Sequence, residues 1–359
     1  MSARVRFGTL LAAGVATLLV GCTVAPPAAP EVPPATVGAS PNAPEVIATG
    51  LAAPWSIAFR DGTPLVSERN SGNILELDSS GASRVIGTVT GVVAAGEGGL
   101  LGLAVDGQRR VYAYSTAADG NRVQRFDVTG APGSLALGPA ETLLDRIPAA
   151  GTHNGGRIAF GPDGMLYVTT GDAGQRANAQ DRSSLSGKIL RMTPDGGIPA
   201  DNPAPESLVY SYGHRNPQGL AWAADGTMFA AEFGQNTWDE LNIITPGANY
   251  GWPTVEGIAG RDGFTDPVQQ WRPADASPSG MAILAGTVFV ANLRGQVLRA
   301  VPVNEPGTAS TYFGGDFGRL RDAVVAPDGK LWLLTNNTDG RGAPRPNDDR
   351  IVGVALGSQ

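Results

Sequence analysis

Short apolar segments alternate with tight turns along most of the chain. The recurring unit is an apolar strand, a turn of the Asp-Gly type and a second apolar strand, as in Ile158–Phe160, Asp163-Gly164 and Leu166–Val168. Both residues of an Asp-Gly pair tolerate positive φ, which suits the tight turn of a β-hairpin. The pattern therefore predicts hairpins, and the 50 Gly and 28 Pro of the chain argue against long helices.

This unit occurs six times, and a third strand such as Lys188–Met192 usually follows it. The six turns lie at Asp61-Gly62, Asp106-Gly107, Asp163-Gly164, Asp225-Gly226, Ala285-Gly286 and Asp328-Gly329. Copies roughly 45 to 60 residues apart match the blade period of a propeller. We therefore expect an all-β fold, a six-bladed β-propeller of four-stranded blades. An array of immunoglobulin-like sandwiches is the alternative, but the turn spacing and the chain length fit it less well.

The segment Pro44–Leu51 resembles the outer strands of other blades, although it precedes the first full blade. We expect it to pair with Asp349–Val354 and complete the sixth blade, because this pairing removes an open sheet edge. The ring is thus closed by an N-terminal strand, and the propeller domain spans residues 44–359.

The first residues are typical of an exported lipoprotein. Arg4 and Arg6 precede an apolar run, Phe7–Val20, that ends at Gly21-Cys22. These are the features of a secretory signal peptide, expected over residues 1–21, and the cysteine resembles a lipidation site. A plain signal peptide with an incidental cysteine is the alternative.

The Pro- and Ala-rich residues 22–43 are expected to form an extended tether. The protein would then be exported and anchored through the lipid on Cys22 to the outer face of the cell membrane. Because Cys22 is the only cysteine, no internal disulfide is possible. The formal charge of −7 argues against a nucleic-acid partner.

Both histidines, His153 and His214, immediately precede inner strands, which directs them toward the mouth of the channel. A neutral imidazole there can accept a proton, and a carboxylate such as Asp172 can orient it and stabilise its cation. Asp239-Glu240 and nearby backbone carbonyls are hard oxygen ligands that suit Ca²⁺. The alternatives are a histidine that only makes structural hydrogen bonds and an acidic turn exposed to solvent.

Four arginines also lie in loops or strand entries near this end of the blades: Arg215, Arg294, Arg319 and Arg321. If they converge on the channel, they predict an anionic ligand with several carboxylates or phosphates. If they do not, they belong to a solvated surface. The chain has no Gly-rich phosphate loop or dinucleotide fingerprint in a strand–helix context, so NAD and ATP are not expected.

Several longer strings resemble one family. They are His153 through Gly164 to Gly171-Asp172, Gly96–Leu101, Ser184–Arg191, Tyr210–Gly219, and Asp239 through Asn249–Pro253. From about Leu51 to Val354 the chain is similar to the soluble glucose/sorbosone dehydrogenases, aldose sugar dehydrogenases that use pyrroloquinoline quinone (PQQ). The fold of that family is a six-bladed propeller, which agrees with the number of repeats.

The resemblance implies roles for individual residues. His153 matches the general base that takes the proton of the anomeric hydroxyl, and Asp172 matches its supporting acid. The matches to cofactor-binding positions are Glu97, Arg215, Asn216, Arg294, Arg319 and Arg321; Arg215 would also stabilise charge on the quinone during catalysis. Calcium would be held by the carbonyls of Gly234 and Gln235, and a second, structural calcium by Glu240 and the carbonyl of Tyr250.

Two positions depart from the family pattern: Gln235, where proline is frequent, and Glu97, where glutamine is frequent. A carboxylate at position 97 would repel an anionic cofactor unless an arginine or calcium lies beside it.

The implied function is the PQQ- and calcium-dependent oxidation of aldose sugars at the anomeric carbon to lactones, with electrons passing to an external acceptor. One alternative is a calcium-dependent lactonase of the propeller type, which needs a metal-activated water but no set of arginines. Another is a non-catalytic lipoprotein that binds sugars or a protein partner through the same face. The arginines together with His153 favour the dehydrogenase.

Overall fold

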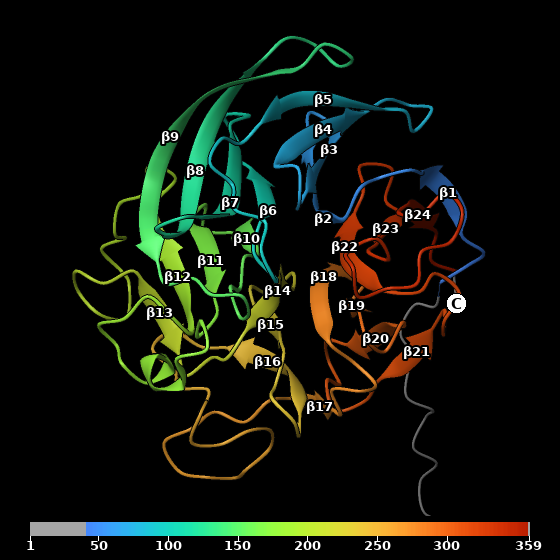
Figure 1. Cartoon of the computed structure of the whole chain (residues 1–359). Helices are drawn as coiled ribbons and strands as arrows, with labels where there is room; N and C mark the ends of the chain where they lie inside the picture. Colours follow the sequence, from blue (N-terminus) through green and yellow to red (C-terminus); the bar gives the residue numbers. More distant parts are fainter. Residues whose placement is uncertain (1–40, 358–359) are drawn as a thin grey trace, which may run out of the picture. The chain divides into compact units, whose positions relative to one another are not determined.

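Six four-stranded antiparallel sheets surround a central axis as the blades of a propeller (Figure 1). The computed structural model describes residues 41–357. The predicted all-β fold and the number of blades are confirmed. The expected signal peptide, Cys22 and almost all of the expected tether lie outside the described residues.

Each blade runs outward from its first strand, which lines the channel. Blade one is β2 (Pro54–Arg60), β3 (Thr63–Glu68), β4 (Asn73–Leu77) and β5 (Ser83–Thr88). Blade two is β6 (Leu100–Val105), β7 (Val111–Ala117), β8 (Gly120–Thr129) and β9 (Ala136–Ile147). Blade three is β10 (Ile158–Phe160), β11 (Leu166–Thr170), β12 (Lys188–Met192) and β13 (Val209–Tyr212). Blade four is β14 (Pro217–Trp222), β15 (Met228–Glu232), β16 (Asp239–Ile244) and β17 (Gln269–Trp271). Blade five is β18 (Pro278–Leu284), β19 (Thr287–Asn292), β20 (Leu298–Pro302) and β21 (Ser310–Tyr312). Blade six is β22 (Leu320–Val325), β23 (Leu331–Thr335), β24 (Ile351–Val354) and β1 (Glu45–Ala48).

The second strand of each blade is covered on both faces by the neighbouring blades. Every residue of β7, β11 and β23 is buried, which explains why these segments are nearly continuous apolar runs. Between blades two and three, for example, Tyr112 and Leu166 belong to one apolar cluster. The core is therefore a ring of such clusters, and it fixes the loops at the ends of the strands.

The ring closes as predicted. β1 pairs antiparallel with β24, with Glu45 opposite Gly353 and Val46 opposite Val352, and the two strands lie side by side in Figure 1. Ala48 is buried in the same cluster as Trp332 of β23. An N-terminal strand thus completes the last blade.

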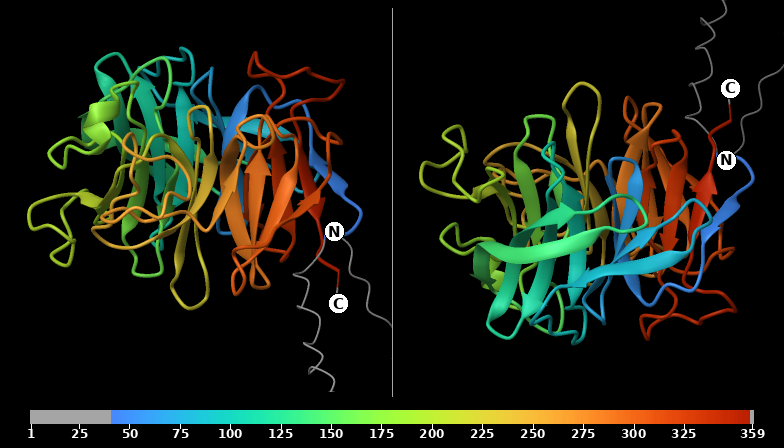
Figure 2. Two further views of the ribbon diagram at one scale, coloured as in Figure 1. Left: turned by 90° about the horizontal axis from the view of Figure 1, so that it is seen from below. Right: turned by 90° about the horizontal axis from the view of Figure 1, so that it is seen from above.

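Seen edge-on, the ring carries loops on both of its faces (Figure 2). The connection between β11 and β12 contains a single turn of 3₁₀ helix, η1 (Arg176–Ala179). Within residues 41–357 there is no helix long and apolar enough to cross a bilayer.

Candidate active site

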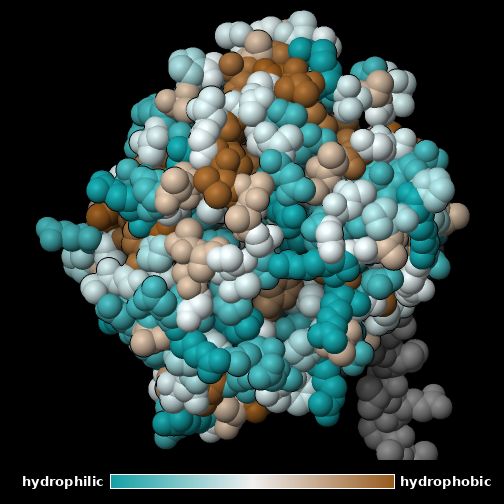
Figure 3. Space-filling model, in the orientation of Figure 1, coloured by the Kyte–Doolittle hydropathy of each residue, from teal (hydrophilic) through white to brown (hydrophobic). Residues whose placement is uncertain are grey.

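The loops that precede the inner strands surround a cavity of about 390 Å³. The predicted site residues that line it are Glu97, His153, Arg215, Asn216, Gly234, Gln235, Arg294, Arg319 and Arg321. The four arginines of the sequence analysis therefore do converge. Figure 3 looks onto this face of the ring, where hydrophilic residues border the centre.

His153 and Asp172 form a close pair at the edge of the cavity. Nδ1 of His153 lies 2.7 Å from Oδ1 of Asp172. The side chain of Asp172 is fully buried, whereas that of His153 is 19% exposed and lines the cavity. With Nδ1 held by the carboxylate, Nε2 is the ring atom left for a ligand.

The backbone brings these two residues together under tight constraints. His153 adopts a positive φ of 57°, an uncommon conformation for a non-glycine residue. Its N–H donates to Oε2 of Glu97 at 2.8 Å. A Cβ at Gly171 would lie 2.0 Å from the carbonyl oxygen of His153. Only glycine allows this approach of the two loops.

Asp172 is held in its ionised form. Burial alone would raise its pKa, but hydrogen bonds from His153, the indole of Trp252 and the N–H of Gly174 outweigh burial and hold the pKa below its usual range. A permanent carboxylate beside Nδ1 keeps the proton on that nitrogen and stabilises an imidazolium.

Buried cationic groups with unused hydrogen-bonding capacity line the other side of the cavity. The Nε atoms of Arg215, Arg319 and Arg321 are buried and find no hydrogen-bond partner within residues 41–357. Burial lowers the pKa of Arg321 to about 9. Arginines left unsatisfied in this way fit a ligand that carries several carboxylates.

The sequence analysis missed two further arginines of the cavity, Arg69 and Arg341. Nη1 of Arg341 lies 3.6 Å from Oε1 of Glu97, so an arginine does compensate the carboxylate that departs from the family pattern. No local motif marks Arg341, because its loop reaches Glu97 only through the closure of the ring.

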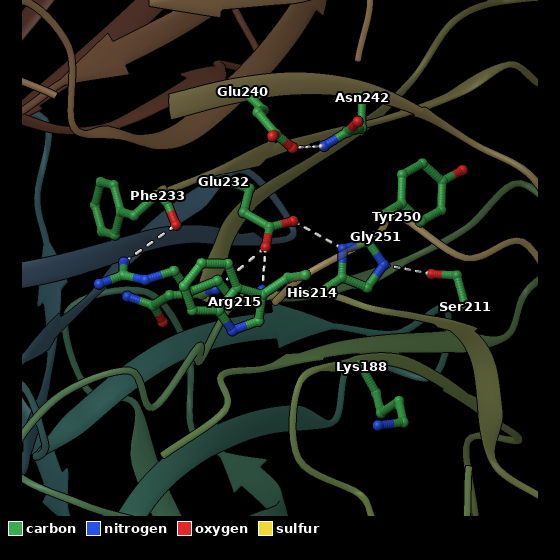
Figure 4. A network of polar contacts seen from close by, with 12 residues as sticks. Lys188, Ser211, His214, Arg215, Glu232, Phe233, Glu240, Asn242, Tyr250 and Gly251 are labelled. Carbon is green, nitrogen blue, oxygen red and sulfur yellow. Dashed lines mark hydrogen bonds and ion pairs between the residues drawn. The ribbon is translucent and has the colours of Figure 1, made fainter. Parts of the chain in front are cut away.

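A buried network around Glu232 of β15 holds the backbone of Arg215 and Asn216. Figure 4 shows Glu232 with Arg215 and His214. Glu232 accepts hydrogen bonds from the backbone N–H groups of Arg215 and Asn216 and from Nδ1 of His214. His214 is fully buried and is stacked on Tyr250, with ring centroids 4.7 Å apart. The expectation that His214 faces the channel mouth is therefore wrong: its imidazole points into the blade and braces the Arg215 loop.

Glu240 lies in a second, small cavity. Glu232, Glu240, Tyr250 and Glu256 line this space of about 10 Å³, which is the size of a single water or ion. Burial raises the pKa of Glu240, and the negative charge of Glu232 raises it further. Within the described residues, the Glu240 carboxylate accepts hydrogen bonds from the amide of Asn242 and the N–H of Gly257, and from no lysine or arginine. Buried like charges of this kind fit a divalent cation.

Side chains alone do not complete that site. In the described part of the chain, no group of three or more His, Cys, Asp or Glu side chains is arranged to hold a metal. A cation beside Glu240 would therefore draw on backbone oxygens, and the carbonyl of Tyr250 is the one predicted from the sequence.

Gly234 and Gln235 belong to a loop at the cavity wall. The carbonyl of Gly234 accepts a hydrogen bond from Nη1 of Arg215, so a calcium ion on this oxygen would take the place of that contact. The N–H of Gln235 donates to Oε1 of Glu256 at 2.6 Å, and Thr237 and Trp238 donate to the same oxygen. Glu256, which the sequence analysis missed, organises this loop.

Comparison with known proteins places this site in a family. The family model described as Glucose / Sorbosone dehydrogenase matches residues 51–343, so the chain belongs to that family. The expectation of an enzyme of the oxidoreductase class is thereby confirmed.

Three relatives illustrate the similarity. The PQQ-bound form of an aldose sugar dehydrogenase from Streptomyces coelicolor is 48% identical, with a TM-score of 0.85 over 89% of this chain and 98% of that chain. Aldose sugar dehydrogenase YliI of Escherichia coli is 31% identical, covering 86% of this chain and 92% of that protein. Quinoprotein glucose dehydrogenase B of Acinetobacter calcoaceticus is 32% identical, over 61% of this chain and 54% of that protein.

Proposed function

We propose that this protein is a PQQ- and calcium-dependent dehydrogenase that oxidises aldose sugars at the anomeric carbon to lactones. One observation carries the proposal: a histidine held by a buried, ionised aspartate shares a cavity with Arg215, Arg319 and Arg321, whose Nε atoms find no hydrogen-bond partner in the part of the chain that the structure describes. Membership of the family supports it, as does the PQQ-bound relative from Streptomyces coelicolor.

PQQ would supply a two-electron acceptor for the hydride of the anomeric carbon. Nε2 of His153 accepts the proton of the anomeric hydroxyl, and Asp172 stabilises the resulting imidazolium. Arg319 and Arg321 would bind carboxylates of the cofactor, and Arg215 would oppose the negative charge that develops on its quinone. Loss of one hydride and one proton turns the cyclic sugar into its lactone, and the electrons then pass to an external acceptor.

Calcium would be bound at two places. The carbonyls of Gly234 and Gln235 would hold an ion at the wall of the large cavity. Glu240, with the carbonyl of Tyr250, would hold another in the small cavity, where the negative charge of Glu232 lies close to Glu240. The concentration of arginines is what favours this enzyme over a lactonase or a non-catalytic binding protein, since neither needs a site for several carboxylates.

The test is calorimetric titration of PQQ into residues 44–359 with Ca²⁺ present, followed by dye-linked oxidation of glucose. Tight saturable binding and calcium-dependent turnover are expected. His153→Ala should retain the binding and lose the turnover. Absence of PQQ binding would overturn the proposal and favour the lactonase or the binding protein.

We also propose export and anchoring to the outer face of the cell membrane through a lipid on Cys22, which rests on the signal-like first residues. Cys22→Ala should move the protein from the membrane fraction to the soluble fraction. Mass spectrometry of the full chain should show a lipidated N-terminus at Cys22. An unmodified protein in the membrane fraction would contradict the anchor.

A further inference from the structure

Trp252 lies behind the proposed base rather than in the cavity. It is 7% exposed and is absent from the cavity lining to which His153 belongs. Its backbone is fixed on both sides, because its N–H donates to the carbonyl of Gly213 at 2.9 Å and its carbonyl accepts from Nε2 of Gln180 at 2.7 Å. The backbone of Trp252 is therefore held by contacts within the protein, and its side chain also lines the small cavity beside Glu240.

The indole N–H of Trp252 donates to Oδ2 of Asp172 at 2.8 Å. The other oxygen of this carboxylate, Oδ1, faces Nδ1 of His153 at 2.7 Å and the N–H of Gly174 at 2.8 Å. The two oxygens of Asp172 thus have separate tasks, one toward the base and one toward Trp252. Because the carboxylate is buried, solvent does not reach Oδ2 directly.

The face of the same indole lies against Arg215, with the guanidinium carbon 5.4 Å from the ring centroid. Trp252 therefore contacts both the partner of the proposed base and the arginine proposed to oppose charge on the cofactor. Asp172 lies in the β11–β12 connection of blade three, Arg215 lies in the connection between β13 and β14, and Trp252 lies in the loop after β16.

We infer that Trp252 is a positioning residue of the reaction: its indole N–H fixes the Asp172 carboxylate in the orientation that holds His153 ready to accept a proton. The role in turnover rests on the proposed function, whereas the effect on the His153–Asp172 pair does not. Trp252 does not line the large cavity and its indole N–H donates to Asp172, so it would act through Asp172.

Removal of the N–H donor has a defined effect on the pair. Loss of a hydrogen bond makes the Asp172 carboxylate less stable in its charged form. The coupled His153–Asp172 pair should then release its proton at a higher pH, so its apparent pKa should rise. The charged groups around the pair include Arg215 and Glu97, and Arg176 lies over the Trp252 ring at 5.4 Å from its centroid; all three remain in Trp252→Phe.

The first experiment needs no cofactor. The chain has only two histidines, so His153→Gln identifies which imidazole signals in a ¹H–¹⁵N NMR titration belong to His153. In Trp252→Phe the midpoint of the His153 titration should move upward. An unchanged midpoint would overturn the inference, even if the variant were less active.

The matched control is Trp332→Phe. Nε1 of Trp332 is buried without a hydrogen-bond partner in the described residues, and this residue packs in blade six away from the cavity. The substitution therefore removes the same atoms without removing a hydrogen bond. It should lower thermal stability and leave the His153 titration unchanged. An equal upward shift in both variants would also overturn the inference.

The second experiment measures kinetics on the PQQ-loaded protein. Trp252→Phe should lower kcat roughly tenfold and shift the acid limb of the pH profile upward, with KM for the sugar nearly unchanged. Because Trp252 acts through Asp172, adding Trp252→Phe to Asp172→Ala should cause little further loss. Multiplying losses would show that Trp252 has only a general structural role. If the wild-type protein does not bind PQQ, the proposed function fails, and the NMR titration still decides the role of Trp252.

Discussion

Gly171 shows how strongly a single position constrains the site. A Cβ at this residue would lie 2.0 Å from the carbonyl oxygen of His153 and 3.0 Å from Oδ1 of Asn216. The neighbouring atom is backbone, so the loop of His153 would have to move. Asp172 follows directly in the chain and would move with it.

We predict that Gly171→Ala lowers the free energy of unfolding by about 1–3 kcal/mol, as overpacking does, and also lowers turnover of the PQQ-loaded protein. Chemical denaturation and dye-linked kinetics measure the two effects. Gly107→Ala is the control, because nothing lies within 4 Å of a Cβ at that position. Wild-type behaviour of both variants would mean that the His153 loop tolerates displacement.

At the residue scale, sequence motifs predicted the site residues that lie close together in the chain. They missed the residues that only the folded ring brings to the site. His153 and Asp172 stand in one hairpin, so a single stretch of sequence identifies the pair. Trp252 and Arg341 reach the same site from other blades, and no motif or spacing in the sequence indicates that they belong to it. The burial of His214 was missed for a related reason. His214 precedes β14 and its partner Glu232 lies on β15, and the sequence does not show that the imidazole turns toward that strand.

At the scale of elements, the loop Gly234–Trp238 owes its shape to one distant carboxylate. Oε1 of Glu256 accepts the N–H groups of Gln235, Thr237 and Trp238. The three N–H groups thus point toward Glu256. This contact organises the loop whose carbonyls at Gly234 and Gln235 are the proposed calcium ligands.

We predict that Glu256→Ala raises the Ca²⁺ concentration needed for half-maximal turnover by roughly ten-fold, the effect typical of groups that orient metal ligands. Titration of Ca²⁺ into metal-stripped protein measures it. Asp266→Ala is the matched control, since this carboxylate accepts the N–H groups of Ala259 and Gly260 in an exposed loop away from the cavity. A wild-type calcium response in Glu256→Ala would contradict a calcium site in this loop.

The buried carboxylates Glu232 of β15 and Glu240 of β16 predict that stability depends on whether Ca²⁺ is present. Glu240 is ionised only at a cost in stability when no cation is present, because burial and Glu232 both oppose its charge. Glu240→Gln should therefore raise the melting temperature of metal-free protein. The wild type should gain stability as Ca²⁺ is added, and the variant should gain less. Differential scanning calorimetry with and without Ca²⁺ tests both, and an equal calcium response would contradict a site at Glu240.

The strands were predictable and the long connections were not, for a physical reason. The position of a strand depends on the residues that the neighbouring blades bury. Those buried residues are recognisable in the sequence as apolar runs. The connection between β11 and β12 instead wraps around Lys188, whose buried Nζ donates to the carbonyls of Asn178, Ala179 and Ser186. Burial lowers the pKa of Lys188 to about 8. A lysine inside a strand pattern does not reveal such a role.

At the scale of the whole molecule, closure of the ring connects the N-terminal strand to the site. Leu51 and Asp349 exchange backbone hydrogen bonds at 3.0 Å, and the segment between β23 and β24 carries both Asp339 and Arg341. Asp339 lies 3.3 Å from Nη2 of Arg319. The loops that complete the arginine side of the cavity thus depend on blade six being whole.

We predict that a chain beginning at residue 50 melts several degrees below one beginning at residue 44, because β24 then becomes an open edge. The exposed ion pair between Lys330 and Glu45 contributes little to this difference, since surface pairs of this kind are weak. Glu45→Gln in the longer chain is therefore the control and should melt like the wild type. The unpaired edge should also make the shorter chain associate as its concentration rises, which sedimentation velocity detects. Equal melting temperatures for the two chains would show that β1 covers an edge that is stable without it. The arginine side of the cavity would then owe its geometry to β22–β24 alone.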